Sequence, residues 1–118
     1  MHEFSLMENV MNTVKDSARE NRIKRISKIK LIIGQMTMAV PDSMQFAFEV
    51  LSNAYEPLFN NAVLEIEEQP VRCLCSSCGC SFEPSVMYML ICPCCQGAHI
   101  EITSGRELFL DFFEGEDE

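Results

Sequence analysis

The sequence contains no apolar run close to the roughly 18 residues that a membrane-spanning helix needs. It also lacks a basic start. The segment from Met1 to Val10 contains acidic Glu3 and Glu8 but no Lys or Arg, whereas a secretory signal begins with basic residues. We therefore expect a cytoplasmic protein that has no membrane partner.

Basic residues are scarce. The chain has nine Lys and Arg but 18 Asp and Glu, so its formal net charge is −9. Phosphate contacts need clustered Lys and Arg, so no nucleic-acid partner is expected. Seven of the nine lie close together in the sequence. This basic cluster is either a solvated helix end followed by an edge strand with gatekeeper charges, or a docking surface for an acidic partner. Its members are Lys15, Arg19, Arg22, Lys24, Arg25, Lys28 and Lys30.

Catalytic patterns are missing as well. The two histidines, His2 and His99, are distant in the sequence, and neither a phosphate-binding loop nor a nucleophile motif is present. We therefore expect a protein that is not an enzyme.

Two helices are predicted. Ser5 followed by Glu8 is a capping-box pattern, so the first helix should begin near Ser5 and end at Asn21. Pro41 suits the first turn of a second helix, and Pro57 closes it. Apolar residues spread widely around this second helix, which predicts that it is nearly enclosed. They are Met44, Phe46, Ala47, Phe48, Val50, Leu51 and Ala54.

Three segments have the alternating pattern of strands, namely residues 28–33, 63–68 and 106–113. The acidic residues 114–118 should form a frayed, solubilising end. The predicted fold class is α+β, a small domain of two helices on a three-stranded mixed sheet with an inserted zinc-ribbon-like module. The helical domain should comprise residues 1–69 plus 105–118, and the zinc-binding domain residues 70–104.

All seven cysteines fall between Cys73 and Cys95, where other core-forming residues are few. An odd number of cysteines in a cytosolic protein argues for metal binding rather than disulfides. Such a stretch can hardly fold by hydrophobic burial alone, so a metal should supply folding free energy.

The cysteine spacing C-x2-C-x13-C-x2-C is typical of a structural zinc site, with ligands Cys75, Cys78, Cys92 and Cys95. Gly79 follows the first pair and can adopt the left-handed conformation that a knuckle turn favours. Four thiolates also suit iron, as in an electron carrier, so iron is the alternative metal. A closed site of either kind leaves no open position for hydrolysis.

Cys73, Cys80 and Cys94 remain outside this set. Cys94 cannot easily chelate together with its neighbour Cys95, so it is expected to be a small packing residue or an exposed thiol.

The chain begins Met1-His2-Glu3, and this segment offers a second metal site. The imidazole of His2, backbone nitrogens and the Met1 amine can form a planar nitrogen set, which Ni(II) and Cu(II) prefer. The carboxylate of Glu3 can orient this set or ligate axially. Taken alone, this signal is weak, because a His at position 2 is usually an ordinary disordered terminal residue. His99 is either a solvated side chain or an additional ligand that couples the zinc module to nickel.

Nearly the whole chain resembles the HypA/HybF family of nickel-insertion accessory proteins in hydrogenase maturation. The motifs that carry the resemblance are Met1-His2-Glu3 before the first helix, Phe46-Ala47-Phe48-Glu49, Leu64-Glu65-Ile66, Cys75-x-x-Cys78-Gly79-x-x-Phe82, Cys92-Pro93-x-Cys95 and Ser104-Gly105-Arg106-Glu107-Leu108. Cys73, Cys80 and Cys94 are extra to the usual four cysteines.

The resemblance implies nickel at His2 with Glu3 in support, and zinc at the four chosen cysteines. It also implies delivery of nickel, with a maturation GTPase (HypB), to the large subunit of a NiFe-hydrogenase. Urease accessory proteins are further expected partners, and the chain is expected to be a monomer or a homodimer. The competing interpretation is a zinc-ribbon interaction module that carries no transferable metal.

Overall fold

The computed structural model describes residues 2–55, 57–86 and 89–117, with His2 described by its backbone alone. The chain forms two compact units. No helix among the described residues is long and apolar enough to cross a membrane. The first unit is Met1–Ile32 with Ala39–Glu67 and Phe109–Glu118, and the second is Ile33–Met38 with Glu68–Leu108.

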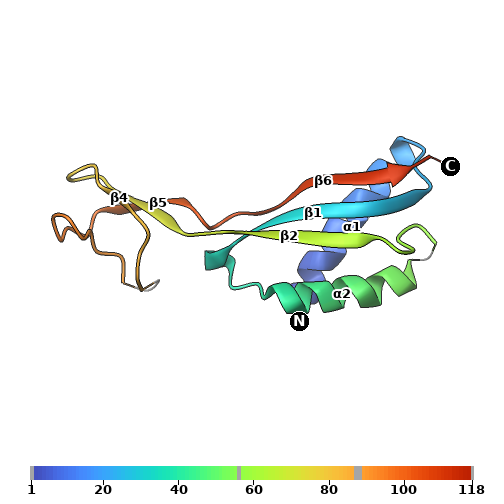
Figure 1. Ribbon diagram of the computed structural model, residues 1–118, viewed down its shortest axis with the longest axis horizontal. Coiled ribbons are helices and arrows are strands. Elements are labelled where there is room, and N and C mark those ends of the chain that lie inside the picture. The colour runs from blue at the N-terminus through green and yellow to red at the C-terminus, as the bar shows by residue number, and fades with distance from the viewer. Residues whose placement is uncertain (1, 56, 87–88, 118) are drawn as a thin grey trace. The chain divides into compact units, whose positions relative to one another are not determined.

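The first unit is built on a three-stranded sheet in the order β2-β1-β6. In Figure 1, β1 (Arg25–Gly34) and β2 (Val63–Gln69) run in the same direction, and β6 (Leu108–Glu116) runs against them. Helix α1 (His2–Glu20) crosses behind the sheet in this view, and α2 (Pro41–Ala54) packs against α1. The predicted α+β class, with two helices on a mixed three-stranded sheet, is confirmed.

Apolar residues at helical spacing and at every second strand position fill the core of this unit. On α1 the buried face combines residues three, four and seven positions apart, and on β1 the residues that alternate with Lys28 and Lys30 are buried. Phe59 is fully buried and meets Phe48 edge-on, with ring centroids 6.3 Å apart. The core side chains include Met7, Met11, Val14, Ala18, Ile29, Leu31, Met44, Ala47, Phe48, Phe59 and Leu64.

Both helices differ from their predicted extents. Helix α1 begins at His2 rather than near Ser5, and a tertiary contact explains the difference. The carboxylate of Glu3 accepts a hydrogen bond from the backbone N–H of Val40, at 3.3 Å, which holds the first turn of α1 against the residue before α2. An acidic residue in a first turn also interacts favourably with the helix dipole.

The prediction that helix α2 is nearly enclosed is wrong. Its buried residues are Met44, Ala47 and Phe48, whereas Phe46 is 61% exposed and Val50 is 40% exposed. One face of this helix therefore packs on the unit, and an apolar flank faces solvent.

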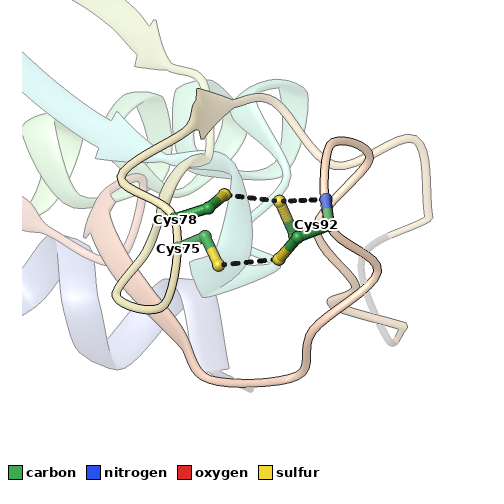
Figure 2. A group of neighbouring side chains, drawn as sticks. Cys75, Cys78 and Cys92 are labelled. Carbon is green, nitrogen blue, oxygen red and sulfur yellow. Dashed lines mark hydrogen bonds between the residues drawn. The ribbon is translucent and has the colours of Figure 1, made fainter.

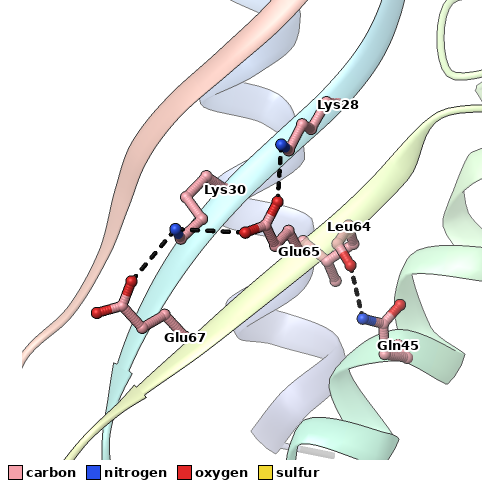
Figure 3. A network of polar contacts seen from close by, with 6 residues as sticks. All are labelled: Lys28, Lys30, Gln45, Leu64, Glu65 and Glu67. Atoms are coloured by element: carbon pink, nitrogen blue, oxygen red, sulfur yellow. Dashed lines mark hydrogen bonds and ion pairs between the residues drawn. The ribbon is translucent and has the colours of Figure 1, made fainter.

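Lys28 and Lys30 lie on the central strand of the sheet, so the prediction of an edge strand with gatekeeper charges is wrong. The Lys28 ammonium lies 2.8 Å from Glu65, and Lys30 lies 3.4 Å from Glu65 and 3.2 Å from Glu67 (Figure 3). The hydrogen bond to Glu65 raises the pKa of Lys28, and the same bond lowers the pKa of Glu65. These are cross-strand ion pairs. An acidic partner that docked here would have to compete with two carboxylates.

The acidic end of the chain is ordered up to Glu116, because β6 includes it. β6 continues to Glu116, whose carbonyl accepts a hydrogen bond from the Lys24 N–H at 2.8 Å. Glu118 lies outside the described residues. Strand pairing therefore orders part of the predicted tail.

The second unit contains a small antiparallel sheet in the order β4-β3-β5. Its strands are β3 (Arg72–Cys75), β4 (Ser81–Phe82) and β5 (Ile100–Ser104), and a short 3-10 helix, η1 (Gln35–Thr37), also belongs to this unit. Among its described residues, the buried side chains of 68–108 are those of Val71, Cys73, Cys75 and Cys92.

Within this unit the end of β1 and the turn before β6 come into backbone contact. The N–H of Gly34 donates to the Glu107 carbonyl at 2.6 Å, and the N–H of Met36 donates to the Gly105 carbonyl at 2.8 Å. A Cβ atom on Gly34 would collide with the carbonyl of Gly105. The Ser104-Gly105-Arg106-Glu107 motif therefore has a structural role, in which glycines allow two backbones to meet.

Gly34→Ala should lower the free energy of unfolding by about 1–3 kcal/mol. The added Cβ atom would collide with the Gly105 carbonyl, and neither backbone can move away without breaking these hydrogen bonds. Urea unfolding followed by circular dichroism measures the change, with Ser85→Ala at an exposed loop position as the control. An unchanged midpoint for Gly34→Ala would contradict the close contact.

Candidate metal centre

Two turns of the second unit bring four cysteines together. Cys75 and Cys78 lie at the end of β3 and in the turn after it, and Cys92 and Cys95 lie in the facing turn (Figure 2). All four Sγ atoms lie within 4.8 Å of one another. The Cys75–Cys95 pair is 3.6 Å apart and the Cys78–Cys92 pair 3.5 Å apart. A zinc ion with bonds of about 2.3 Å to sulfur needs tetrahedron edges of about 3.8 Å, so the donor set fits such an ion.

The two turns share one backbone geometry. In the first, the N–H of Cys75 donates to the Cys80 carbonyl at 2.9 Å and the N–H of Gly79 donates back to the Cys75 carbonyl at 2.8 Å. In the second, the N–H of Cys92 donates to the Gly97 carbonyl at 3.0 Å, and the N–H of Gln96 donates to the Cys92 carbonyl at 2.8 Å. Each turn therefore presents its two sulfur atoms in the same way.

The residue after each turn has left-handed backbone geometry. Gly79 has φ +79°, and its counterpart in the second turn is Gln96 with φ 61°. Glycine adopts this conformation freely, and a residue with a Cβ atom is strained there. Gly97 comes one residue too late for this role. A Cβ atom on Gly97 would lie 3.2 Å from the Cys95 sulfur, so the glycine leaves room for the cluster.

Backbone N–H groups favour the thiolate form of one cysteine in each turn. The Cys92 sulfur accepts from the N–H of Cys95 at 3.5 Å and from the N–H of Cys94 at 3.3 Å, and these bonds lower the pKa of Cys92 to about 6. The N–H of Cys78 acts in the same way and lowers the pKa of Cys75. Two ligands are therefore prepared for a cation.

The thiols of the other two cysteines, Cys78 and Cys95, have raised rather than lowered pKa values. The Cys80 N–H acts to lower the pKa of Cys78, but the neighbouring thiol of Cys92 and burial outweigh it and raise that pKa to about 12. The Gly97 N–H acts to lower the pKa of Cys95, but contacts with the thiols of Cys75 and Cys92 together with burial outweigh it and raise that pKa. A metal ion that displaces these protons removes the conflict among four crowded sulfur atoms.

The three other cysteines divide into two kinds. Cys73 is 1% exposed on β3, and burial raises the pKa of its thiol. Cys80 and Cys94 instead form a second group with Cys92, in which the three Sγ atoms also lie within 4.8 Å of one another. Contact with the Cys94 thiol raises the pKa of Cys80 to about 12. The spacing of the sequence did not reveal this second group.

The predicted nickel residues lie elsewhere. Met1 and the side chain of His2 lie outside the described residues, while the His2 backbone and Glu3 belong to the first turn of α1. His99 is an exposed residue of the second unit. Its carbonyl accepts hydrogen bonds from the N–H and the hydroxyl of Ser76, both at 3.0 Å. Among the described residues, His99 belongs to no group of three or more potential metal ligands.

Comparison with known proteins identifies the family. The family model described as "Hydrogenase/urease nickel incorporation, metallochaperone, hypA" matches residues 1–115. The Hydrogenase maturation factor HypA of Moorella thermoacetica is 39% identical over 116 residues, which cover 98% of this chain and 100% of that protein. The Guanidine hydrolase-activating protein A of a Synechocystis strain is 35% identical over 115 residues, covering 97% and 94%.

Two solved structures share the fold. The nickel metallochaperone HypA of Helicobacter pylori superposes with a TM-score of 0.68 at 23% identity, covering 98% of each chain. A second HypA solution structure gives a TM-score of 0.74 at 24% identity, covering 100% of this chain and 98% of the other. The family match over nearly the whole length and the 39% identity to the Moorella protein show that the chain belongs to the HypA family of hydrogenase/urease nickel-incorporation metallochaperones.

Proposed function

We propose that this protein binds Ni(II) at its N-terminus and delivers it, with a HypB-like maturation GTPase, to the large subunit of a NiFe-hydrogenase. The observation that carries the proposal is the family match, which begins at residue 1 and so includes the Met1-His2-Glu3 segment. Relatives named as hydrogenase maturation factors support hydrogenase as the receiving enzyme.

The start of α1 suits nickel coordination by the backbone. The first four N–H groups of a helix have no acceptor within the helix, and α1 begins at His2. The amide nitrogens of His2 and Glu3 can therefore deprotonate and bind a cation without breaking a helical hydrogen bond. Two amide nitrogens and an imidazole belong to the planar nitrogen set that Ni(II) prefers.

The second metal of the proposal is a structural Zn(II) at Cys75, Cys78, Cys92 and Cys95. It is held in a zinc-binding domain of residues 70–104, whereas residues 1–69 plus 105–118 bind nickel. The small number of buried apolar side chains in the described part of 68–108 supports a metal as the source of folding free energy. Four protein ligands close the coordination shell, which suits a structural rather than a catalytic metal.

His2→Ala should abolish specific Ni(II) binding, measured by equilibrium dialysis, and hydrogenase activity in cells, while the zinc held by the four cysteines stays bound. Binding by the unaltered protein should weaken as the pH falls through about 6.5, because a proton competes with nickel for the imidazole. An extension before Met1 tests whether the terminal amine takes part. Full nickel binding by His2→Ala would refute the proposal.

The receiving enzyme is tested in the same cells. The family description also names urease, and the Synechocystis relative is named for guanidine hydrolase. A deletion strain should lose hydrogenase activity and regain it with added nickel. Loss of urease or guanidine hydrolase activity with normal hydrogenase activity would refute hydrogenase as the receiving enzyme and identify the affected enzyme instead.

Two substitutions of Glu3 separate coordination from anchoring, because the carboxylate also accepts the Val40 N–H. Glu3→Gln keeps an oxygen that can accept this bond but loses the charge, and Glu3→Ala loses both. If Glu3 supports nickel by its charge, both variants should bind about 10-fold or more weakly. Glu3→Gln should retain the thermal stability that Glu3→Ala loses. Unchanged nickel affinity in Glu3→Gln would leave Glu3 as an anchor only.

The knuckle turns give a matched pair of zinc predictions. Gln96→Gly should remove the backbone strain of a residue with positive φ, and Gly79→Ala should introduce such strain. Each substitution should change the free energy of the folded turn by about 1 kcal/mol. Competition with a chelator should therefore show zinc affinity about five-fold higher in the first variant and about five-fold lower in the second. Nothing lies within 4 Å of a Cβ atom on Gly79, so a clash does not complicate the second variant. Equal affinities in all three proteins would refute the backbone argument.

A further inference from the structure

We infer that Cys80 and Cys94, with Cys92 as a shared sulfur ligand, form a second thiolate site that takes a second thiophilic divalent cation such as Zn(II) or Cd(II). The inference depends on the four-cysteine centre proposed above but not on nickel. The three Sγ atoms lie within 4.8 Å of one another, the same limit that encloses the first four. The two groups have only Cys92 in common.

The backbone that builds the first centre also holds the second. The carbonyl of Cys80 accepts the Cys75 N–H at 2.9 Å, so Cys80 is fixed at the end of the first turn. Cys94 lies inside the second turn, and its N–H donates to the Cys92 sulfur at 3.3 Å. Both thiols are therefore positioned by the same hydrogen bonds as the primary ligands.

The charge of the combined cluster favours a second cation. A divalent ion bound to four thiolates leaves two negative charges in excess, which attract further cations. Binding of a second divalent ion displaces the protons of Cys80 and Cys94. The two added thiolates then balance its charge, and the excess stays the same. The Cys92 thiolate donates one electron pair to each metal and gives up part of its long hydrogen bonds to the N–H groups of Cys94 and Cys95.

The second site differs from the first in the number of its protein ligands, which are three rather than four. Cys94 is exposed and Cys80 is half-buried, and Cys78 and Cys95 of the first site are exposed as well. Three protein sulfur atoms leave a fourth tetrahedral position for water or an incoming ligand. The second ion should therefore exchange readily, while the ion of the closed site stays bound.

Co(II) is the probe, because its bonds to thiolate sulfur give charge-transfer absorption that nitrogen and oxygen ligands do not produce. Metal-free, reduced protein is titrated without air in a His2→Ala background, which removes the N-terminal site. We expect two equivalents to bind with thiolate charge-transfer bands. The paramagnetism of the first ion should fall when the second binds, since a bridging sulfur couples two Co(II) ions.

The double variant Cys80→Ser/Cys94→Ser should stop at one equivalent, with the spectrum of the first ion unchanged. Cys73→Ala is the matched control, because Cys73 is also outside the first centre but belongs to neither group, and it should still bind two.

Saturation at one equivalent in the parent protein, or a second equivalent in the double variant, would overturn the inference. Two ions without magnetic coupling would overturn the shared role of Cys92. Failure of the first equivalent would instead refute the four-cysteine centre.

Discussion

The crowding of four sulfur atoms within 4.8 Å of one another is the constraint on which the second compact unit depends. Four thiolates at this separation repel one another. Among the described residues of 68–108, the buried side chains, which include Val71 and Cys73, are too few to hold the turns together by apolar burial. In the proposed function, a divalent cation bound at the centre would replace this repulsion by attraction, so metal binding and folding of this unit would be one equilibrium.

Local patterns were sufficient to predict most of the architecture. The α+β class followed from helical and alternating periodicity, and the paired C-x2-C turns pointed to the four cysteines that the structure brings together. The errors arose where a distant contact decides the outcome. Helix α1 starts early because Glu3 meets Val40, and β1 is central because β2 and β6 pair on both of its sides. No window of sequence around Ser5 or Lys28 contains that information.

The finer details of the metal centre show the same limit. Gly79 was readable as a left-handed residue because glycine is common there, but Gln96 adopts the same conformation without any signal in its side chain. Likewise, Cys80 and Cys94 looked like surplus cysteines, since they follow no ligand spacing. They meet because two turns of equal geometry face each other across the cluster, which is a property of the fold rather than of either segment.

The hydrogen bond from the Val40 N–H to Glu3 would connect the proposed nickel site to helix α2. Val40 is the residue that precedes α2, and a pocket beside it is lined by Glu3, Phe4, Asp42, Ser43 and Phe46. A cation that draws the Glu3 carboxylate toward itself must take it from that N–H group. The loaded and empty forms would then differ at the first turn of α2 and at the exposed ring of Phe46, so a partner that touches this helix could distinguish a carrier with cargo from one without.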